Sequence, residues 1–334
     1  MNRQLFQYHP QIGYTFIPGL KTRVAHEGGG YLVQANQAGF RSSREFERQK
    51  PAGVFRILLF GDSFTAADGV SNSARYSDLL ESHFPGVEIF NYGLSGTGTD
   101  QQYVIYRELA AEIECDLVVI AVLVENIRRV AARYRVYLDA AGKRVVYAKP
   151  YFCLESGRKL VRYHEPVPKE PVPEDHLPPE ELQHVDQGGN FAWFRQTVNT
   201  LGSRARDVVQ RWSRYQPLPA YESAEHPDWI LTRAILSQWI SECSSPVIVC
   251  PLPLYQHVEE TCDPTAYQAR FRELGTETGA VIHDPLPDYW QVPDSTRRKF
   301  RFPSDIHPTP LSHQLLADSL KPCIQSFLHP GDDE

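Results

Sequence analysis

The sequence has no long hydrophobic run and no large excess of basic residues. No apolar stretch in its 334 residues approaches the roughly 20 residues that span a bilayer, so we expect no membrane span. Residues 1–10 lack the apolar core of a signal peptide, which predicts a cytoplasmic protein. A formal net charge of -7 argues against nucleic acid as a partner. The chain has the composition of an ordinary globular protein.

Patterns that hold metals, disulfides or dinucleotides are missing as well. The six cysteines show no paired spacing, and no His-x-x-x-His pair occurs among the twelve histidines. Cys115 and Cys250 lie beside or within apolar runs and are interpreted as core residues. Residues 96–98 are Gly-Thr-Gly, but Gln101 stands where a dinucleotide-binding motif has its third glycine. We therefore predict neither a metal nor a cofactor, and the oligomeric state stays open.

The most informative stretch is an apolar run at residues 54–60, which is followed by Gly61, Asp62 and Ser63. Such a run predicts a strand buried on both faces, as in a parallel sheet. Ligands bind at the carboxyl ends of strands in open α/β sheets. Ser63 therefore lies where a nucleophile would act.

A second candidate segment lies far downstream. Thr309 fits an N-cap, and Pro310 fits the first position of the helix that follows. Asp305 and His307 are then left on the loop before this helix. A nucleophilic serine needs a base that takes its proton and an acceptor that orients the base. His307 and Asp305 supply these two parts.

Both segments resemble the SGNH (GDSL-like) hydrolase superfamily, whose members share short blocks in a fixed order. The first block is similar to residues 61–65, Gly-Asp-Ser-Phe-Thr, and the last carries an acid and a histidine. The resemblance implies an α/β fold and a serine esterase. Its catalytic triad would be Ser63, His307 and Asp305.

Two segments between them resemble the middle blocks of the family. Residues 91–99 place Gly96 at the oxyanion-hole glycine, and residues 122–127 place Asn126 at the asparagine. Both segments follow predicted strands, and a glycine leaves its N–H open to a substrate. The N–H groups of Ser63 and Gly96 and the Asn126 amide are therefore predicted to form an oxyanion hole.

The chain departs from the family pattern at two places. The third block has Val124 and Ile127 where the family has a glycine and an acid. The last block has Asp305 two residues before His307, whereas Ser304 occupies the family's usual position, three residues before. We expect Asp305 to orient His307. Otherwise a backbone carbonyl would do so, and a Ser–His dyad would remain.

The pattern of the whole chain predicts an α/β protein. Strand and helix patterns alternate over residues 56–127, which indicates βαβ units. Two more strands are predicted at residues 245–251 and 280–284. We predict a three-layer α/β/α sandwich with a mostly parallel five-stranded sheet, of the SGNH or flavodoxin-like type. It would form a hydrolase-like domain at residues 53–330.

Residues 1–52 are predicted to form a β extension packed on this core. Residues 27–30 would be the turn of a hairpin between strands at 13–19 and 31–36. Residues 36–41 also resemble leaders that precede the serine block in bacterial SGNH proteins. We expect the extension to cover a sheet edge, in preference to a role in substrate binding.

An insertion at about residues 128–220 follows Asn126. It contains a predicted strand-turn-strand at 137–147 and a proline-rich stretch, and helical patterns return near 191–213 and 225–243. Because the insertion leaves from the predicted site, we expect a cap that shapes the substrate pocket. The alternative is a dimer interface, which would suit the aromatic residues Trp193, Phe194, Trp212 and Tyr215.

Charged residues beside the predicted site form a further candidate set. Arg128 and Arg129 could hold an anionic group of the substrate, although such a run is more often a solvated helix face. Glu125 could act as a second acid or anchor a loop. The possible substrate-binding residues are therefore Asp62, Glu125, Arg128 and Arg129.

Together these features predict a serine esterase of the SGNH type. It would cleave an O-acyl ester, with an acetyl or another short acyl group, through a covalent acyl-enzyme. The substrate would be a small-molecule or glycan ester. An acyltransferase acting on a sugar or a specialised metabolite would use the same site. A third alternative is a non-catalytic SGNH-like module that binds a glycan or a partner protein.

Overall fold

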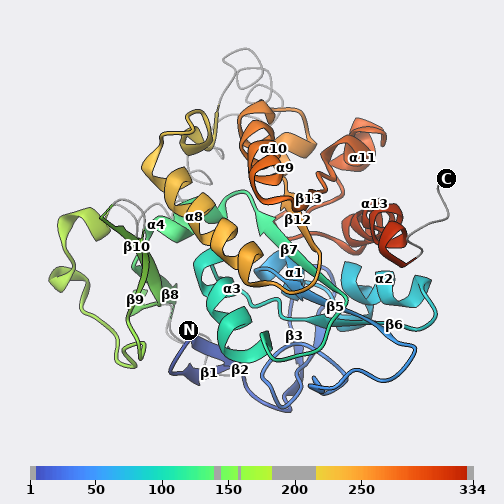
Figure 1. Cartoon of the computed structure of the whole chain (residues 1–334), viewed down its shortest axis with the longest axis horizontal. Helices are drawn as coiled ribbons and strands as arrows, with labels where there is room; N and C mark the ends of the chain where they lie inside the picture. Colours follow the sequence, from blue (N-terminus) through green and yellow to red (C-terminus); the bar gives the residue numbers. More distant parts are fainter. Residues whose placement is uncertain (1–4, 139–143, 157–158, 183–215, 329–334) are drawn as a thin grey trace.

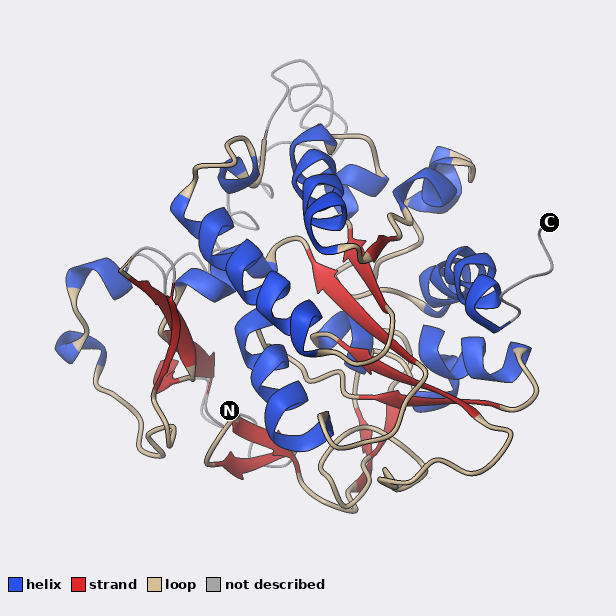
Figure 2. Cartoon of the chain, viewed as in Figure 1, coloured by secondary structure: helices blue, strands red, loops and turns tan. Residues whose placement is uncertain are grey.

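A five-stranded parallel sheet lies at the centre of the molecule (Figure 2). The computed structural model describes residues 5–138, 144–156, 159–182 and 216–328. The sheet strands are β5 (Phe55–Phe60), β6 (Val87–Asn91), β7 (Leu117–Leu123), β12 (Val247–Leu252) and β13 (Val281–Ile282). They lie in the order β13-β12-β7-β5-β6, and every neighbouring pair is parallel. The predicted sheet is confirmed.

Helices cover both faces of this sheet, as predicted for a three-layer sandwich (Figure 1). On one face lie α3 (Thr99–Ile105), α8 (Pro227–Glu242) and α10 (Thr265–Thr278), and α8 contacts both of the others. On the other face α2 (Tyr76–His83) packs against α13 (Pro310–Leu328). The chain passes from β5 outward to β6 and then back across β5 to β7. Because crossovers between parallel strands are right-handed, reversing the direction puts the connecting helices on the opposite face of the sheet.

Short helical segments occupy the loops between these elements. They are α1 (Ser63–Ala66), α4 (Asn126–Ala131), α9 (Tyr255–Val258), α11 (Leu286–Trp290), α12 (Asp294–Arg297), the 3-10 turns η1 (Asn72–Ala74), η3 (Glu174–His176) and η4 (Pro219–Tyr221), and the π-helical turn η2 (Tyr106–Ala110). The long helix α13 begins at Pro310, as predicted. The Thr309 hydroxyl donates to the Lys299 carbonyl at 2.8 Å and so ties the start of α13 to the preceding loop.

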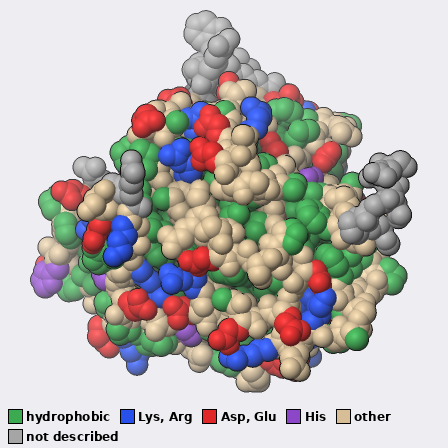
Figure 3. Space-filling model, viewed as in Figure 1, with side chains coloured by type: hydrophobic (Ala, Val, Ile, Leu, Met, Phe, Trp, Pro, Cys, Tyr) green, Lys and Arg blue, Asp and Glu red, His purple; other side chains and the backbone are tan. Residues whose placement is uncertain are grey.

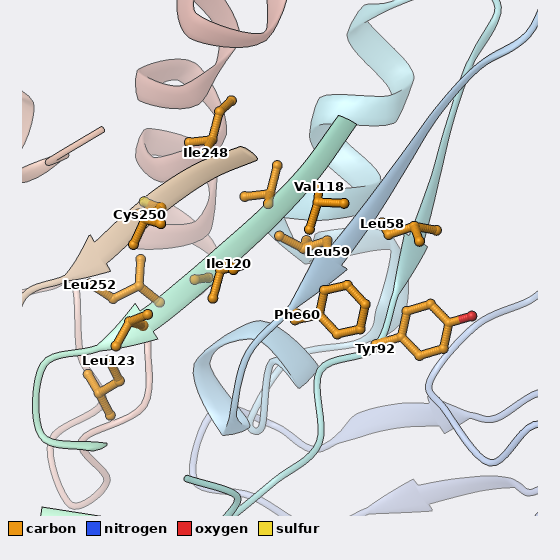
Figure 4. Packing of buried hydrophobic residues seen from close by; sticks show 14 of the residues in the cluster. Leu58, Leu59, Phe60, Tyr92, Val118, Ile120, Leu123, Ile248, Cys250 and Leu252 are labelled. Atoms are coloured by element: carbon orange, nitrogen blue, oxygen red, sulfur yellow. The ribbon is translucent and has the colours of Figure 1, made fainter. Parts of the chain in front are cut away.

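The central strands are apolar along their whole length because both of their faces are covered. All seven residues of β7 and all six of β12 are buried. Figure 4 shows their side chains beside those of β5, where Phe60 stacks on Tyr92 with ring centroids 5.0 Å apart. Each fully buried Val, Leu or Ile side chain contributes about 1.5–3 kcal/mol. Strands held in this way fix the positions of the loops at their carboxyl ends.

Two antiparallel hairpins precede the sheet, and their pairing differs from the predicted one. β1 (Phe6–His9) pairs with β2 (Gly13–Phe16), and β3 (Lys21–Val24) pairs with β4 (Tyr31–Gln34). The predicted pairing of the β2 segment with the β4 segment is therefore wrong. The glycine-rich turn does close a hairpin, but its first strand is β3, whose residues alternate between exposed and half-buried. A short, polar strand of this kind gives a weak signal in a sequence.

The described part of the insertion contains two further hairpins beyond α4. β8 (Tyr134–Leu138) pairs with β9 (Arg144–Ala148), and β10 (Tyr151–Glu155) pairs with β11 (Lys159–Tyr163). The first hairpin corresponds to the predicted strand-turn-strand, although its first strand starts earlier. The helix predicted near 191–213 lies outside the described residues, as do the aromatic residues of the dimer alternative, Trp193, Phe194, Trp212 and Tyr215.

No helix in the described ranges combines the length and the apolar character needed to cross a membrane. Within the same ranges, no three His, Cys, Asp or Glu side chains gather in a way that could hold a metal ion. On the face shown in Figure 3, basic and acidic side chains are interspersed. The most distinctive chemistry gathers at the carboxyl ends of the strands.

Candidate active site

The candidate nucleophile, Ser63, is the first residue of α1, just beyond the end of β5. Asp62 caps this short helix, because its carboxylate accepts a hydrogen bond from the Phe64 N–H at 3.0 Å. The helix ends at Ala67, whose φ of 66° lies in the left-handed region. A buried strand, a capped turn and a tight exit thus fix the Ser63 side chain beside the sheet.

A buried arginine from the N-terminal segment holds the exit of α1. This residue is Arg41. Its guanidinium donates hydrogen bonds to the carbonyls of Ala66 at 2.7 Å, Ala67 at 2.6 Å and Val70 at 2.7 Å. Burial, together with the charge of Arg75, lowers the pKa of Arg41 to about 10. Arg41 therefore stays charged near neutral pH and satisfies carbonyls that would otherwise be buried without partners.

Ser63, His307 and Asp305 form one hydrogen-bonded chain. Ser63 Oγ lies 2.9 Å from His307 Nε2, and His307 Nδ1 lies 2.6 Å from Asp305 Oδ1. Because a carboxylate only accepts, Nδ1 carries the proton, and Nε2 is left to accept the serine hydroxyl. The His307 N–H also donates to Asp305 Oδ1, at 3.0 Å. This arrangement favours Asp305 over a backbone carbonyl as the partner of the His307 ring.

The surroundings stabilise the charged forms of both Asp305 and His307. Burial acts to raise the pKa of Asp305, but hydrogen bonds from His307 and His26 outweigh it and hold this pKa well below its usual value. Burial acts to lower the pKa of His307, yet the bond to Asp305 and the carboxylate of Asp68 leave it above its usual value. A histidine with a raised pKa is a stronger proton acceptor, which suits a general base.

Gly96 and Asn126 lie beyond the ends of β6 and β7, the two strands that flank β5. Gly96 has a φ of +82°, and a Cβ there would lie 3.0 Å from the Tyr14 hydroxyl, so the position suits glycine. Asn126 is completely buried, and neither its amide nitrogen nor its oxygen has a hydrogen-bond partner among the described residues. Leaving such a group unpaired costs about 1–3 kcal/mol. An amide in this state is expected where a ligand atom completes its bonding.

The four charged candidates interact mainly with one another. Asp62 is completely buried, and its Oδ2 lies 2.7 Å from Arg129 Nη1. The same nitrogen of Arg129 donates to the Thr97 carbonyl at 3.0 Å. Glu125 lies 3.9 Å from Arg129 and 3.8 Å from Arg128, which also donates to a backbone carbonyl. These contacts indicate that the charged residues hold together the strand-end loops, which are the loops that follow β5, β6 and β7. They do not favour a site for an anionic substrate.

The loop that carries Gly96 also touches the N-terminal hairpin and, through it, the insertion. The Tyr14 hydroxyl of β2 donates to the Ser95 carbonyl at 2.6 Å. The Tyr14 ring packs edge-on against Tyr137 of β8, with centroids 5.9 Å apart. The described part of the insertion therefore lies one side chain away from this loop. Its role as a cap stays a prediction.

A small apolar cavity lies beside the loop segment that carries His307. Ile306 and Pro308, the neighbours of His307 in the chain, line it together with Phe64 and Leu252. The cavity volume is about 40 Å³. One water occupies roughly 10–15 Å³ on the same measure, so the space suits only a few carbon atoms.

Two polar residues of the site, Asp68 and His26, were not predicted from the sequence. Asp68 Oδ1 accepts a hydrogen bond from the Ser95 hydroxyl at 2.7 Å, and its Oδ2 lies 4.0 Å from His307 Nε2. His26 Nε2 lies 3.2 Å from Asp305 Oδ2. The closeness of Asp68 to Ser63 in the chain offered a signal. None existed for His26, which lies 279 residues before Asp305.

No family model matches the chain, and no curated protein matches it. The structure is similar to that of a lipolytic protein of the G-D-S-L family from Veillonella parvula, at 11% identity and a TM-score of 0.42, over 81% of this chain and 99% of the other. It is also similar to a lipase/acylhydrolase from Enterococcus faecalis, at 14% identity and a TM-score of 0.44, over 82% of this chain and 96% of the other. A third similar structure is the acetyl xylan esterase AlAXEase, at 12% identity and a TM-score of 0.44, over 81% of this chain and 100% of the other.

Proposed function

We propose that the protein is a serine esterase that cleaves O-acyl esters through a covalent acyl-enzyme. The observation that carries the proposal is the unbroken chain of hydrogen bonds from Ser63 through His307 to Asp305. A nucleophile, a base and an acceptor in this order are the parts that acyl transfer from an ester requires. Ser63 lies in α1, and the other two residues lie in the loop before α13, so two segments far apart in the chain supply the three parts.

In the first half of the reaction, Ser63 Oγ attacks the ester carbonyl while its proton moves to His307 Nε2. Asp305 accepts the Nδ1–H and stabilises the imidazolium that forms. When the tetrahedral intermediate collapses, the bond to the alcohol oxygen breaks and His307 returns the proton to that oxygen. Water then attacks the acyl-enzyme with His307 again as base, which releases the acid and restores the Ser63 hydroxyl.

The negatively charged oxygen of each intermediate would be held by the N–H groups of Ser63 and Gly96 and by the Asn126 amide. The unpaired state of the buried Asn126 amide supports this role, because a substrate oxygen would supply its missing acceptor. Losing one such donor typically raises the barrier by about 2.7–4 kcal/mol.

The cavity beside His307 supports an acetyl or another short acyl group. Its apolar lining from Phe64, Leu252 and Ile306 suits a hydrocarbon chain, and its volume of about 40 Å³ limits the length of that chain. The alcohol would belong to a small molecule or a glycan.

Labelling with a fluorophosphonate probe, which reacts with activated serines, tests the proposal. The wild type and Ser82→Ala, a control at an exposed serine of α2, should label, whereas Ser63→Ala should not. Hydrolysis of p-nitrophenyl acetate should be lost in Ser63→Ala and in His307→Ala. A wild type that stays unlabelled would contradict the proposal and favour the binding module. Faster transfer of the acyl group to an added alcohol than to water would favour the acyltransferase.

A further inference from the structure

The carboxylate of Asp305 lies between two histidines. One oxygen, Oδ1, accepts from His307, while the other, Oδ2, lies 3.2 Å from Nε2 of His26. His26 belongs to the turn between β3 and β4, in the N-terminal hairpin that was expected only to cover a sheet edge. A side chain from outside the sheet thus contacts the acid of the candidate triad.

Local contacts fix which nitrogen of His26 carries the proton. The Gly28 N–H donates to His26 Nδ1 at 3.2 Å, so Nδ1 is the acceptor and Nε2 bears the hydrogen. The bond therefore runs from His26 Nε2–H to the Asp305 carboxylate. It is a charge-assisted bond, which is stronger than one between neutral groups.

The ring of His26 is also held in place by its neighbours. It packs edge-on against Phe302, with centroids 4.4 Å apart, and against Tyr31 at 5.9 Å. Gly69, with a φ of +92°, allows this packing, because a Cβ there would lie 2.8 Å from Phe302 and 3.3 Å from His26. His26 is 12% exposed, whereas Asp305 is 32% exposed, so the histidine is the more buried of the two side chains.

We propose that His26 is a positioning residue that holds the Asp305 carboxylate in line with the His307 imidazole. Both hydrogen bonds from His307 end on Oδ1, so without His26 the second oxygen would face solvent. A carboxylate held at both oxygens cannot rotate away from Nδ1, and the imidazole then stays aimed at Ser63. This inference rests on the proposed function, since it assigns His26 a part in the same proton transfer.

The test compares two substitutions of His26 with a matched control. His26→Phe keeps a ring against Phe302 but removes the donor, whereas His26→Gln keeps an N–H donor at the same reach. The control is His9→Gln in β1, whose Nδ1 also accepts a backbone N–H, that of Gln11. With p-nitrophenyl acetate we expect H26F to lower kcat about tenfold at unchanged KM, H26Q to keep most of the rate, and H9Q to match the wild type.

A double-mutant cycle shows whether His26 acts through Asp305. In an Asp305→Asn background, H26F should cause no further loss of kcat. Full wild-type activity in H26F, or equal additional losses in both backgrounds, would overturn the inference. Thermal melting checks that each variant is folded. If H26F proved unfolded, His26→Met, which replaces the ring with an unbranched apolar side chain, would be compared with H26Q on the same criteria.

Proton NMR separates a failure of this inference from a failure of the proposed function. The His307 Nδ1–H in a short bond to Asp305 should give a far-downfield signal whether or not the protein hydrolyses esters. We expect the signal to broaden by exchange in H26F and to persist in H26Q and H9Q. An inactive wild type would refute the esterase, whereas a sharp signal in H26F would refute the role of His26.

Discussion

The Asp68 carboxylate lies 4.0 Å from Nε2 of His307, the nitrogen that contacts the Ser63 hydroxyl. Asp68 is kept there by the Ser95 hydroxyl, which donates to its other oxygen at 2.7 Å. Two carboxylates therefore act on one imidazole, Asp305 at Nδ1 and Asp68 near Nε2. Burial opposes them, but together they leave the pKa of His307 above its usual value.

Asp68→Asn should lower the pKa of His307, because it removes one of the negative charges that stabilise the imidazolium. Only the neutral imidazole accepts a proton from Ser63, so activity rises as pH increases through this pKa. The acidic limb of a plot of kcat/KM against pH should therefore move to lower pH in the variant. Asp318→Asn, at an exposed position of α13, is the control. A limb that does not move would show that Asp68 has no influence on His307.

Asp305→Asn should lower kcat for p-nitrophenyl acetate by up to about 10⁴, because the amide cannot hold the imidazole in the tautomer that accepts the serine proton. Thermal melting should show that the variant remains folded. The control is Asp294→Asn at an exposed position of α12. If D305N kept nearly the full rate, a backbone carbonyl would have to orient His307, and the site would work as a Ser–His dyad.

Asn126→Ala should lower kcat by about 10²–10³, the usual effect of losing one oxyanion donor. Its free energy of unfolding should not fall, because the Asn126 amide has no partner among the described residues and the substitution removes no hydrogen bond. Asn91 is a matched buried amide whose nitrogen donates to the Thr65 carbonyl and the Ser77 hydroxyl.

Asn91→Ala should therefore lower the free energy of unfolding by about 1–3 kcal/mol, measured by urea denaturation. Equal losses of stability in N126A and N91A would mean that the Asn126 amide is bonded within the folded protein. It would then not be held ready for a substrate.

Arg41→Lys should destabilise the protein although it preserves the charge. A lysine ammonium cannot reach the three carbonyls that the guanidinium bonds, so one or two of them would be left buried and unpaired. We expect a loss of about 2–4 kcal/mol in urea denaturation and slower fluorophosphonate labelling of Ser63. Arg23→Lys, at an exposed position of β3, should change neither quantity. An unchanged free energy of unfolding in R41K would show that the hydrogen bonds from the Arg41 guanidinium to these carbonyls are not needed for stability.

The acyl preference should follow the size of the cavity beside His307. In the wild type, kcat/KM should fall from p-nitrophenyl acetate and butyrate to octanoate. Leu252→Ala enlarges the cavity and should shift the preference toward longer chains. Leu123→Ala removes the paired leucine at the end of the neighbouring strand, at a similar loss of stability, and should leave the preference unchanged. An identical chain-length profile in all three proteins would place the acyl group elsewhere.

The sequence allowed the sheet to be predicted because its strands are buried on both faces. The apolar runs of β5, β7 and β12 have the length typical of buried strands. Polar residues follow two of them, Asp62 and Ser63 after β5 and Glu125 and Asn126 after β7. Parallel strands bring such loops to one edge, so Ser63 and Asn126 could be expected near each other. Their roles in catalysis stay a prediction.

Contacts between distant segments could not be predicted in this way. The bond from His26 to Asp305 joins a hairpin turn to a loop near the other end of the chain, and neither segment has a periodic pattern that indicates the other. The buried position of Arg41 could not be predicted either, because arginine side chains are mostly exposed to solvent and the sequence does not show the carbonyls that Arg41 bonds. The first hairpins were paired wrongly for a related reason, since β3 is short and polar.

The ion pair between Arg129 and Asp62 determines where the insertion can be replaced by that of another protein. Arg129 lies in α4, where the insertion starts, yet its guanidinium bonds the residue that caps the helix of Ser63 and the Thr97 carbonyl of the Gly96 loop. The first turn of the insertion is therefore joined by hydrogen bonds to the turn that carries Ser63 and to the loop that carries Gly96. A graft that began at α4 would cut this link, whereas one that began after Ala131 would leave the three strand-end loops joined.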